Sequence, residues 1–157
     1  MDSFHFEGAE IAPGTGQEVS LELGDGPAGN PRSIPVYIIH GTKPGPVLAI
    51  TAGIHGDELN GVSVAHHLIH GDDHIAGTDD DRIRRDELVG TIICVPVVNI
   101  EGMLLEQRGA PDNKDINRLF PGKAQGNQSQ RIAYALFQSV VKRADCLIDL
   151  HSAPHSR

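Results

Sequence analysis

The sequence has few aromatic residues and very little cysteine. Only 4% of its 157 residues are aromatic, tryptophan is absent, and there are two cysteines. A core without large rings must rest on Val, Ile, Leu and Ala, which suits a sheet packed by helices. Two cysteines are too few for the disulfide framework of a small secreted protein. Because Cys94 and Cys146 lie in apolar runs, we expect both to be reduced and buried.

Long apolar runs and an excess of basic residues are also missing. No segment approaches the roughly 18 apolar residues of a membrane span, and the start, MDSFHFEGAE, lacks the features of a signal peptide. The formal net charge is -8, whereas nucleic-acid binding depends on clustered Lys and Arg. We therefore expect a cytoplasmic protein that binds neither membranes nor nucleic acid. Much of the acidity falls in residues 71–90, expected to be a solvated surface excursion.

Several apolar runs predict β-strands. Three of them are apolar at successive positions, as in strands covered on both faces. These three runs are residues 47–51, 89–99 and 146–150. A further β-branched run covers residues 33–41, and residues 1–33 are expected to be an irregular or edge-strand lead-in.

Two helical patterns alternate with these strands. Residues 59–70 carry apolar side chains at helical spacing, and a second pattern has Ser129 as its expected N-cap and a stripe of Ile132, Leu136 and Val140. The alternation predicts an α/β fold with a mostly parallel sheet flanked by helices in three layers. In such sheets, ligands bind beyond the carboxyl ends of the strands.

Candidate metal ligands follow two of these strand ends. The stretch GIHGDELNG places His55 and Glu58 three residues apart, with glycines that allow close backbone approach, and IDLHS places His151 after a second strand. Catalytic zinc commonly takes three protein ligands of these types. A lone histidine at a strand end is more often a satisfied polar group, and HxxE is frequent by chance. The joint placement at two strand ends favours a metal site.

The loop RGAPDNKDINRLFPG, residues 108–122, carries further candidates. A surface loop can hold such residues without a function, but Arg108, Asn117 and Arg118 have the chemistry of a receptor for a carboxylate or an oxyanion. Asp115 has the chemistry to accept the second ring proton of a ligating histidine.

Taken in order, GIHGDELNG, VPVVN, RGAPDNKDINRLFPG and IDLHS resemble the succinylglutamate desuccinylase and aspartoacylase family, a branch of the zinc carboxypeptidase fold. The resemblance runs from about residue 34 to residue 152 and implies a single zinc-hydrolase-like catalytic domain over residues 1–157. The zinc ligands that it implies are His55, Glu58 and His151. The other roles that it implies are substrate carboxylate binding by Asn117 and Arg118, polarisation of the scissile carbonyl by Arg108, and orientation of His55 by Asp115.

The resemblance implies a zinc-dependent amide hydrolase that removes an acyl group from an N-acyl amino acid or a related small molecule. It extends to members that deacetylate diaminobutyrate derivatives. The alternatives are a zinc carboxypeptidase acting on peptide C-termini and a non-catalytic zinc-binding fragment. In the family the general base is a glutamate downstream of the third ligand, and no residue after His151 is acidic. We therefore expect an amino-terminal portion whose sheet is incomplete at the C-terminus, with an exposed edge that invites homo-oligomer formation.

A cluster of histidines remains outside these motifs. His66, His67, His70 and His74 resemble a metal-rich tract. On the expected helix they fall largely outside the apolar stripe, so a solvated helix face is the favoured interpretation.

Overall fold

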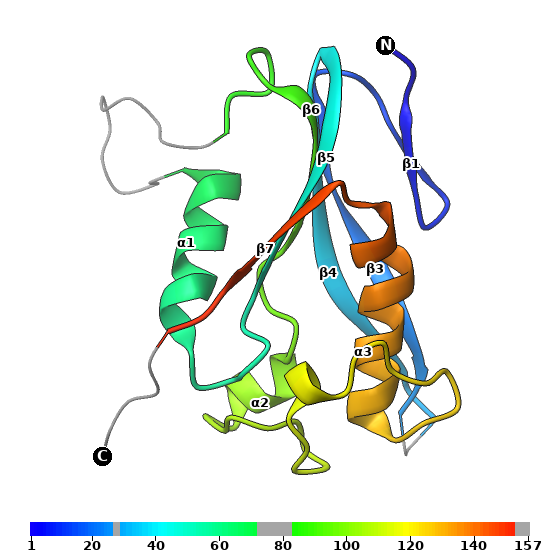
Figure 1. The fold of residues 1–157 in the computed structure, drawn as a ribbon, viewed down its shortest axis with the longest axis vertical. Helices are drawn as coiled ribbons and strands as arrows, with labels where there is room; N and C mark the ends of the chain where they lie inside the picture. Colours follow the sequence, from blue (N-terminus) through cyan, green and yellow to red (C-terminus); the bar gives the residue numbers. More distant parts are fainter. Residues whose placement is uncertain (27–28, 72–82, 153–157) are drawn as a thin grey trace.

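A five-stranded sheet lies between two helices that cover its opposite faces (Figure 1). The computed structural model describes residues 1–26, 29–71 and 83–152. Its strands are β1 (Phe4–Phe6), β2 (Ala9–Ile11), β3 (Thr15–Asp25), β4 (Pro31–His40), β5 (Lys43–Ala52), β6 (Val89–Val95) and β7 (Cys146–Leu150). Its helices are α1 (Leu59–His70), α2 (Ile100–Leu104) and α3 (Gln128–Ser139), with 3₁₀ turns η1 (Ile116–Arg118) and η2 (Val141–Arg143).

The sheet has the order β3-β4-β6-β5-β7 and is mixed rather than mostly parallel. The three strands predicted to be buried do run parallel, because β5 pairs in parallel with both β6 and β7. The pairs β3–β4 and β4–β6 are antiparallel, so the prediction of a mostly parallel sheet is wrong for that half. For β3 and β4 the reason is the length of the connection: only five residues separate the two strands, and a parallel pair needs a crossover of a dozen or more.

The two faces of the sheet form separate hydrophobic clusters. Successive side chains of β6 point to opposite faces, as the period of a strand requires. Ile93 lies in the cluster that contains Leu136 of α3, whereas Cys94 lies in the cluster that contains Ala65 and Ile69 of α1. A strand that is apolar at every position is therefore buried by helices on both sides. This arrangement confirms the expected three layers, and burial raises the pKa of the Cys94 thiol to about 12.

Strand β7 is the exception, and the expectation that it is buried is wrong. It lies at the edge of the sheet, and Cys146 is exposed rather than buried. Leu147 and Ile148 are 43% and 46% exposed. Among the described residues β7 pairs with β5 alone, so its outer edge has no partner strand there. The apolar sequence of a strand does not determine whether the strand takes a central or an edge position in the sheet.

The starts of the helices follow from local capping. Helix α1 covers residues 59–70 as predicted. The N-cap of α3 is Asn127 instead of the expected Ser129, because Asn127 and Gln130 form a reciprocal capping box. Ser129 lies in the first turn, where its backbone N–H donates to Asp112 at 3.1 Å. This contact ties the loop of residues 108–118 to the start of α3.

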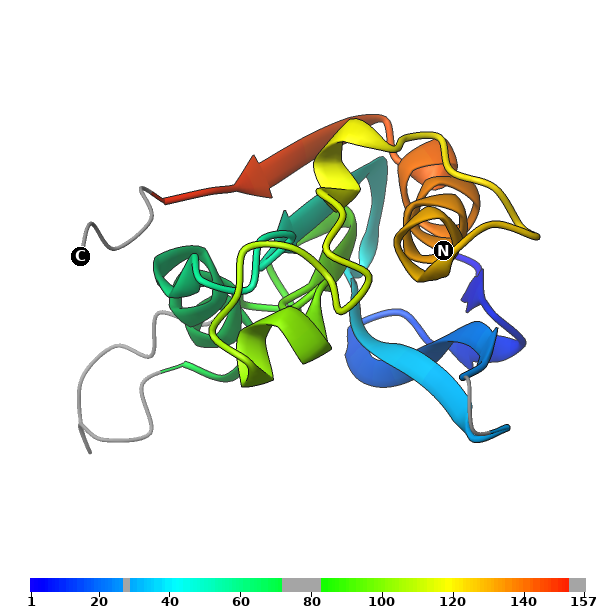
Figure 2. The same cartoon turned by 90° about the horizontal axis from the view of Figure 1, so that it is seen from below.

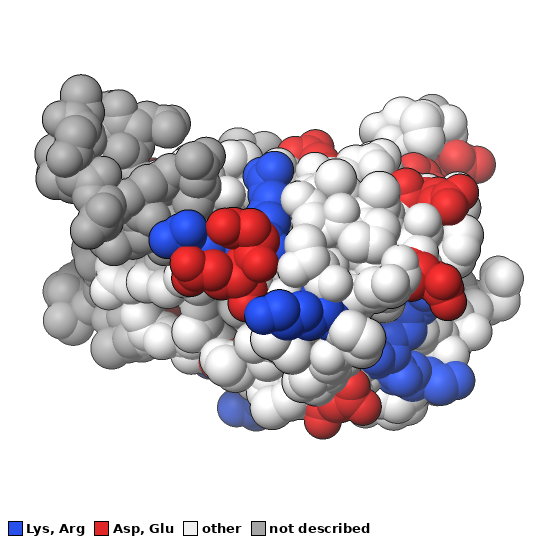
Figure 3. Space-filling view, turned by 90° about the horizontal axis from the view of Figure 1, so that it is seen from above, with Lys and Arg blue, Asp and Glu red and all other residues white. Residues whose placement is uncertain are grey.

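The amino-terminal segment was expected to be an irregular or edge-strand lead-in, and the structure contains both a hairpin and an edge strand there. Strands β1 and β2 form a hairpin, and β3 is an edge strand of the main sheet. The acidic excursion expected at residues 71–90 falls largely on residues 72–82, which lie outside the described residues. Figure 3 shows one end of the molecule, on which basic and acidic side chains are interspersed. No helix within the described ranges has the length and apolar character needed to cross a bilayer.

Candidate metal centre

The parallel pairing of β5 and β7 brings the ends of both strands to the same edge of the sheet (Figure 2). Ala52 is the register partner of Leu150, so the loop after β5 lies beside the residue after β7. His55 and His151 consequently meet, with their ring centroids 5.0 Å apart. Two histidines that are far apart in sequence thus share one site because of strand register.

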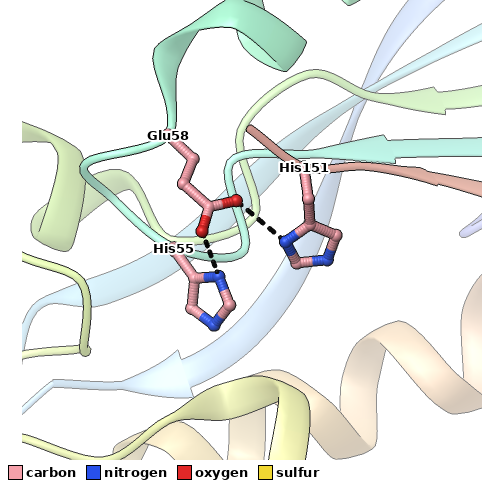
Figure 4. Close-up of side chains that lie close together, drawn as sticks. All are labelled: His55, Glu58 and His151. Carbon is pink, nitrogen blue, oxygen red and sulfur yellow. Dashed lines mark hydrogen bonds and ion pairs between the residues drawn. The ribbon is translucent and has the colours of Figure 1, made fainter. Parts of the chain in front are cut away.

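Glu58 lies between the two rings (Figure 4). Its Oε1 is 2.9 Å from Nδ1 of His55, and its Oε2 is 2.9 Å from Nδ1 of His151. The backbone N–H of Ser152 also donates to Oε2, at 3.1 Å. One ligand atom from each of these three side chains lies within 4.8 Å of the others. Three ligands at about 2.0–2.1 Å from one tetrahedral ion are about 3.3 Å apart, so this donor set fits zinc without a large rearrangement.

The second nitrogen of each ring also faces a carboxylate. Nε2 of His55 is 3.0 Å from Asp115, and Nε2 of His151 is 2.7 Å from Asp149. The hydroxyl of Thr51 donates to the other oxygen of Asp149 at 2.7 Å, across the β5–β7 pair. Carboxylates in this position fix the tautomer and the orientation of metal-ligating histidines. Both rings therefore present Nδ1 to the centre.

The hydrogen-bond donors and acceptors of the two histidine rings are consistent with a cation bound between them and Glu58. A neutral imidazole has one N–H donor and one acceptor nitrogen. Because each ring has carboxylate oxygens at both nitrogens, a neutral ring that donates through Nε2 places an acceptor Nδ1 2.9 Å from an oxygen of Glu58. Two acceptor atoms repel each other at that distance unless a proton or a metal ion lies between them. The chemistry of the donor set thus matches a divalent ion held by His55, Glu58 and His151.

Hydrogen bonds and charge shift the pKa values of the centre. Burial raises the pKa of Glu58, but hydrogen bonds from Ser152, His151 and Arg108 outweigh burial, and the pKa lies below its usual value. For His151, burial lowers the pKa, whereas the hydrogen bond and charge of Asp149 and Glu58 raise it, and the net pKa is raised. The direction of each shift favours the charged form: the carboxylate of Glu58 and the imidazolium of His151.

The glycines around the ligands are required by close packing. A Cβ on Gly56 would lie 2.0 Å from the backbone carbon of Gly102 in α2. A Cβ on Gly61 would lie 2.8 Å from the backbone oxygen of Leu150 at the end of β7. The loop between His55 and Glu58 and the first turn of α1 thus pack directly on the backbone of neighbouring segments.

The residues expected to contact substrate lie beside the centre. Nη1 of Arg108 is 2.8 Å from Oε1 of Glu58, and the Arg108 side chain is 48% exposed. Asp115 accepts from the backbone N–H of Asn117 at 3.1 Å, and Nε of Arg118 lies 3.3 Å from the same carboxylate. The Arg118 side chain is 84% exposed, and Asn117 is also exposed. The structure places all four residues beside the centre. The roles of Arg108, Asn117 and Arg118 toward substrate stay predictions.

Asp149 is the site residue that sequence reasoning missed. It precedes His151 by two positions, and side chains two apart on a strand lie on the same face. That spacing was a usable signal for the contact between the two side chains. The contact with Thr51 had no such signal, because it depends on the register between β5 and β7.

Comparison with known proteins assigns the family. The sequence profile of the succinylglutamate desuccinylase/aspartoacylase catalytic domain matches residues 44–157. The chain therefore belongs to the succinylglutamate desuccinylase/aspartoacylase family.

Individual relatives agree with this assignment. An N-alpha-acetyl-L-2,4-diaminobutyric acid deacetylase from Halomonas elongata is 31% identical over 120 residues, which cover 76% of this chain and 32% of the relative. A solved succinylglutamate desuccinylase/aspartoacylase from Rhodobacter sphaeroides is 30% identical, with a TM-score of 0.75, covering 90% of this chain and 41% of that one. An ectoine utilization protein from Ruegeria pomeroyi, solved with product bound, is 27% identical, with a TM-score of 0.70. The match covers 87% of this chain and 40% of that one. The chain spans less than half the length of each of these relatives.

Proposed function

We propose that this chain carries the metal-binding part of a zinc-dependent deacylase that acts on an N-acyl amino acid or a related small molecule. The observation that carries the proposal is the convergence of His55, Glu58 and His151 within 4.8 Å. The carboxylates on the second nitrogens of both rings add support, because they are the usual partners of metal-ligating histidines. Membership of the family supports the reaction class.

The side chains around the centre have roles that fit amide hydrolysis. Zinc held by the three ligands would polarise the scissile carbonyl and lower the pKa of a water molecule. Arg108 reaches the centre while about half of its side chain stays open to solvent, which suits a donor to the oxygen that gains negative charge. Asn117 and Arg118 are exposed at the same rim, where an arginine with an amide suits a substrate carboxylate.

The first substrate to assay is an N-acetylated diamino acid. The relative from Halomonas elongata is named for deacetylation of N-alpha-acetyl-L-2,4-diaminobutyric acid. We propose the same class of substrate here, with an acyl group on the amine of a small amino acid. A peptide with a free C-terminus, offered in parallel, tests the carboxypeptidase alternative.

The test is zinc binding and hydrolysis by the purified chain and its His151→Ala variant. Calorimetric titration with zinc should show tight binding by the wild type and a loss of at least tenfold in affinity in the variant, because one of three ligands is removed. Release of acetate from N-acetyl-2,4-diaminobutyrate should be lost in parallel. The matched control is His5→Ala, which removes an exposed histidine from β1.

The outcomes separate the parts of the proposal. Tight zinc binding that His151→Ala leaves intact would show that the three side chains are not the ligands. Binding without hydrolysis of either substrate would instead assign a non-catalytic zinc module and overturn the deacylase.

Self-association is a second part of the proposal. The outer edge of β7 and the exposed side chains of Leu147 and Ile148 suit pairing with another chain. Sedimentation of the wild type and of Ile148→Lys checks this expectation. The substitution should convert any dimer to monomer, and an unchanged sedimentation coefficient would contradict pairing through β7.

A further inference from the structure

Two histidines lie one turn apart on the exposed side of α1, away from the candidate metal centre. The ring centroids of His66 and His70 are 4.5 Å apart, with an angle of 44° between the ring planes. Both residues are exposed, whereas Ala65 and Ile69 beside them are buried against the sheet. The helix thus turns its apolar face inward and holds two imidazoles together in solvent.

Spacing and ring separation suit a shared metal ion. Residues four apart on a helix lie on the same face, one above the other. Two nitrogen ligands at about 2.0–2.1 Å from one ion are at most about 4.2 Å apart, a separation that rings 4.5 Å apart can meet. Two histidines at this spacing on a helix are an established way of binding zinc. Imidazole also suits nickel and copper.

The surroundings restrict the pair and favour positive charge. The ring of Tyr37 meets His70 edge-on, with centroids 5.4 Å apart, so His70 has a neighbour that limits its rotation. His70 is also the last residue of α1. The carbonyl end of a helix carries partial negative charge, which stabilises a cation held in the last turn. An ion bound here would therefore gain from the restricted rotation of His70 and from the helix dipole.

The pair is separate from the centre at the other end of α1. Glu58 immediately precedes the helix, and α1 runs from there away from the edge of the sheet that carries His151 (Figure 1). His66 lies eight positions after Glu58, which corresponds to a rise of about 12 Å along the helix. A single ion cannot contact both sets of ligands.

We propose that His66 and His70 form a second, surface metal site that takes a divalent transition-metal ion such as Ni²⁺, Cu²⁺ or Zn²⁺ as a two-histidine chelate, with water completing the coordination. The site is independent of the deacylase proposal, since none of its residues belongs to the candidate centre. It predicts that a zinc titration of the wild type shows a weaker binding event beyond the first.

The test is retention of the full, untagged chain on immobilised Ni²⁺. An immobilised ion reaches exposed side chains, whereas His55 is only 2% exposed. The wild type should be retained and should elute with imidazole. His66→Gln and His70→Gln should each elute at a clearly lower imidazole concentration, because a chelate needs both rings. The control is His5→Gln, which removes one exposed histidine elsewhere and should elute with the wild type.

A solution measurement distinguishes loss of the site from loss of the fold. Titration with Ni²⁺ should give an affinity at least tenfold weaker in each α1 variant than in His5→Gln. Without metal, all variants should keep the circular dichroism and the unfolding midpoint of the wild type. Added Ni²⁺ should raise the midpoint more for the wild type than for either α1 variant. The proposal is overturned if His66→Gln and His70→Gln bind Ni²⁺ like the wild type, or if only one of them matters.

Discussion

Asp149→Asn tests whether the carboxylate behind His151 supports metal binding. In the structure one oxygen of Asp149 is 2.7 Å from Nε2 of His151, and the other accepts from Thr51 at 2.7 Å. Asparagine has one acceptor oxygen and one NH₂ donor. If its oxygen stays with Thr51, its NH₂ faces the N–H of the ring. If it turns over, the Thr51 hydroxyl loses its acceptor.

The size of the effect follows from the exposure of the ring. Loss of a supporting partner typically costs 10- to 100-fold in metal affinity, about 1.4 to 2.7 kcal/mol. The His151 side chain is 33% exposed, so water can replace the lost acceptor, and we expect about tenfold. The same change at Asp115 acts on His55, whose side chain is 2% exposed. For Asp115→Asn we expect a loss in metal affinity near 100-fold, because water cannot readily reach the buried ring to replace the lost acceptor.

The assay is competition with a zinc chelator for the wild type, Asp149→Asn and Asp115→Asn. Asp86→Asn is the control, since its side chain is 71% exposed and contacts Arg84 on the surface. The control should bind zinc like the wild type. Equal affinity in Asp149→Asn and the wild type would refute the supporting role. A larger loss in Asp149→Asn than in Asp115→Asn would refute the reasoning from exposure.

Three further predictions concern packing and pH. Leu136→Ala, at a site that is 2% exposed, should lower the free energy of unfolding by about 2–5 kcal/mol in a denaturant titration; a loss below 1 kcal/mol would contradict its core position. Gly61→Ala places a Cβ 2.8 Å from a backbone oxygen of β7 and should weaken zinc binding, whereas Ser63→Ala on the exposed side of the same helix should not; equal affinities would refute the packing argument. The lowered pKa of Glu58 stabilises the metal-free fold above its usual value of 4.5, and this contribution is lost as the pH falls through the lowered pKa. The raised pKa of His151 stabilises the fold below pH 6.5, and this contribution is lost as the pH rises through the raised pKa. The free energy of unfolding, measured against pH, should therefore show both contributions between about pH 4.5 and 6.5. Glu58→Gln should flatten that profile, and an unchanged profile would count against the contribution of Glu58 and His151 to stability.

Local patterns in the sequence predicted several of the elements and the candidate ligands. Helical spacing of apolar residues identified α1 at its observed bounds, and apolar runs identified the strands β5, β6 and β7. The ligand candidates were visible because His55 and Glu58 are neighbours in sequence and because His151 follows a strand. These signals are short-range, and they depend on side chains within one element and on the turn that ends it.

Other features depended on segments that are distant in sequence. The antiparallel placement of β4 beside β6, the edge position of β7 and the exposure of Cys146 follow from how strands are ordered in the sheet. A run of apolar residues specifies that a strand can be buried, but its neighbours decide whether it is. The N-cap of α3, in contrast, is a local feature that the sequence analysis missed, because Asn127 and Gln130 are only three residues apart and form a reciprocal capping box.

The sequence by itself determined which side chains have the chemistry of metal ligands and which elements carry them. Only the tertiary structure decided that His55 and His151 lie side by side and that Asp149 links Thr51 to His151. The physical reason is that ligand chemistry belongs to each residue, whereas register between strands arises when separate segments bury their apolar surfaces together.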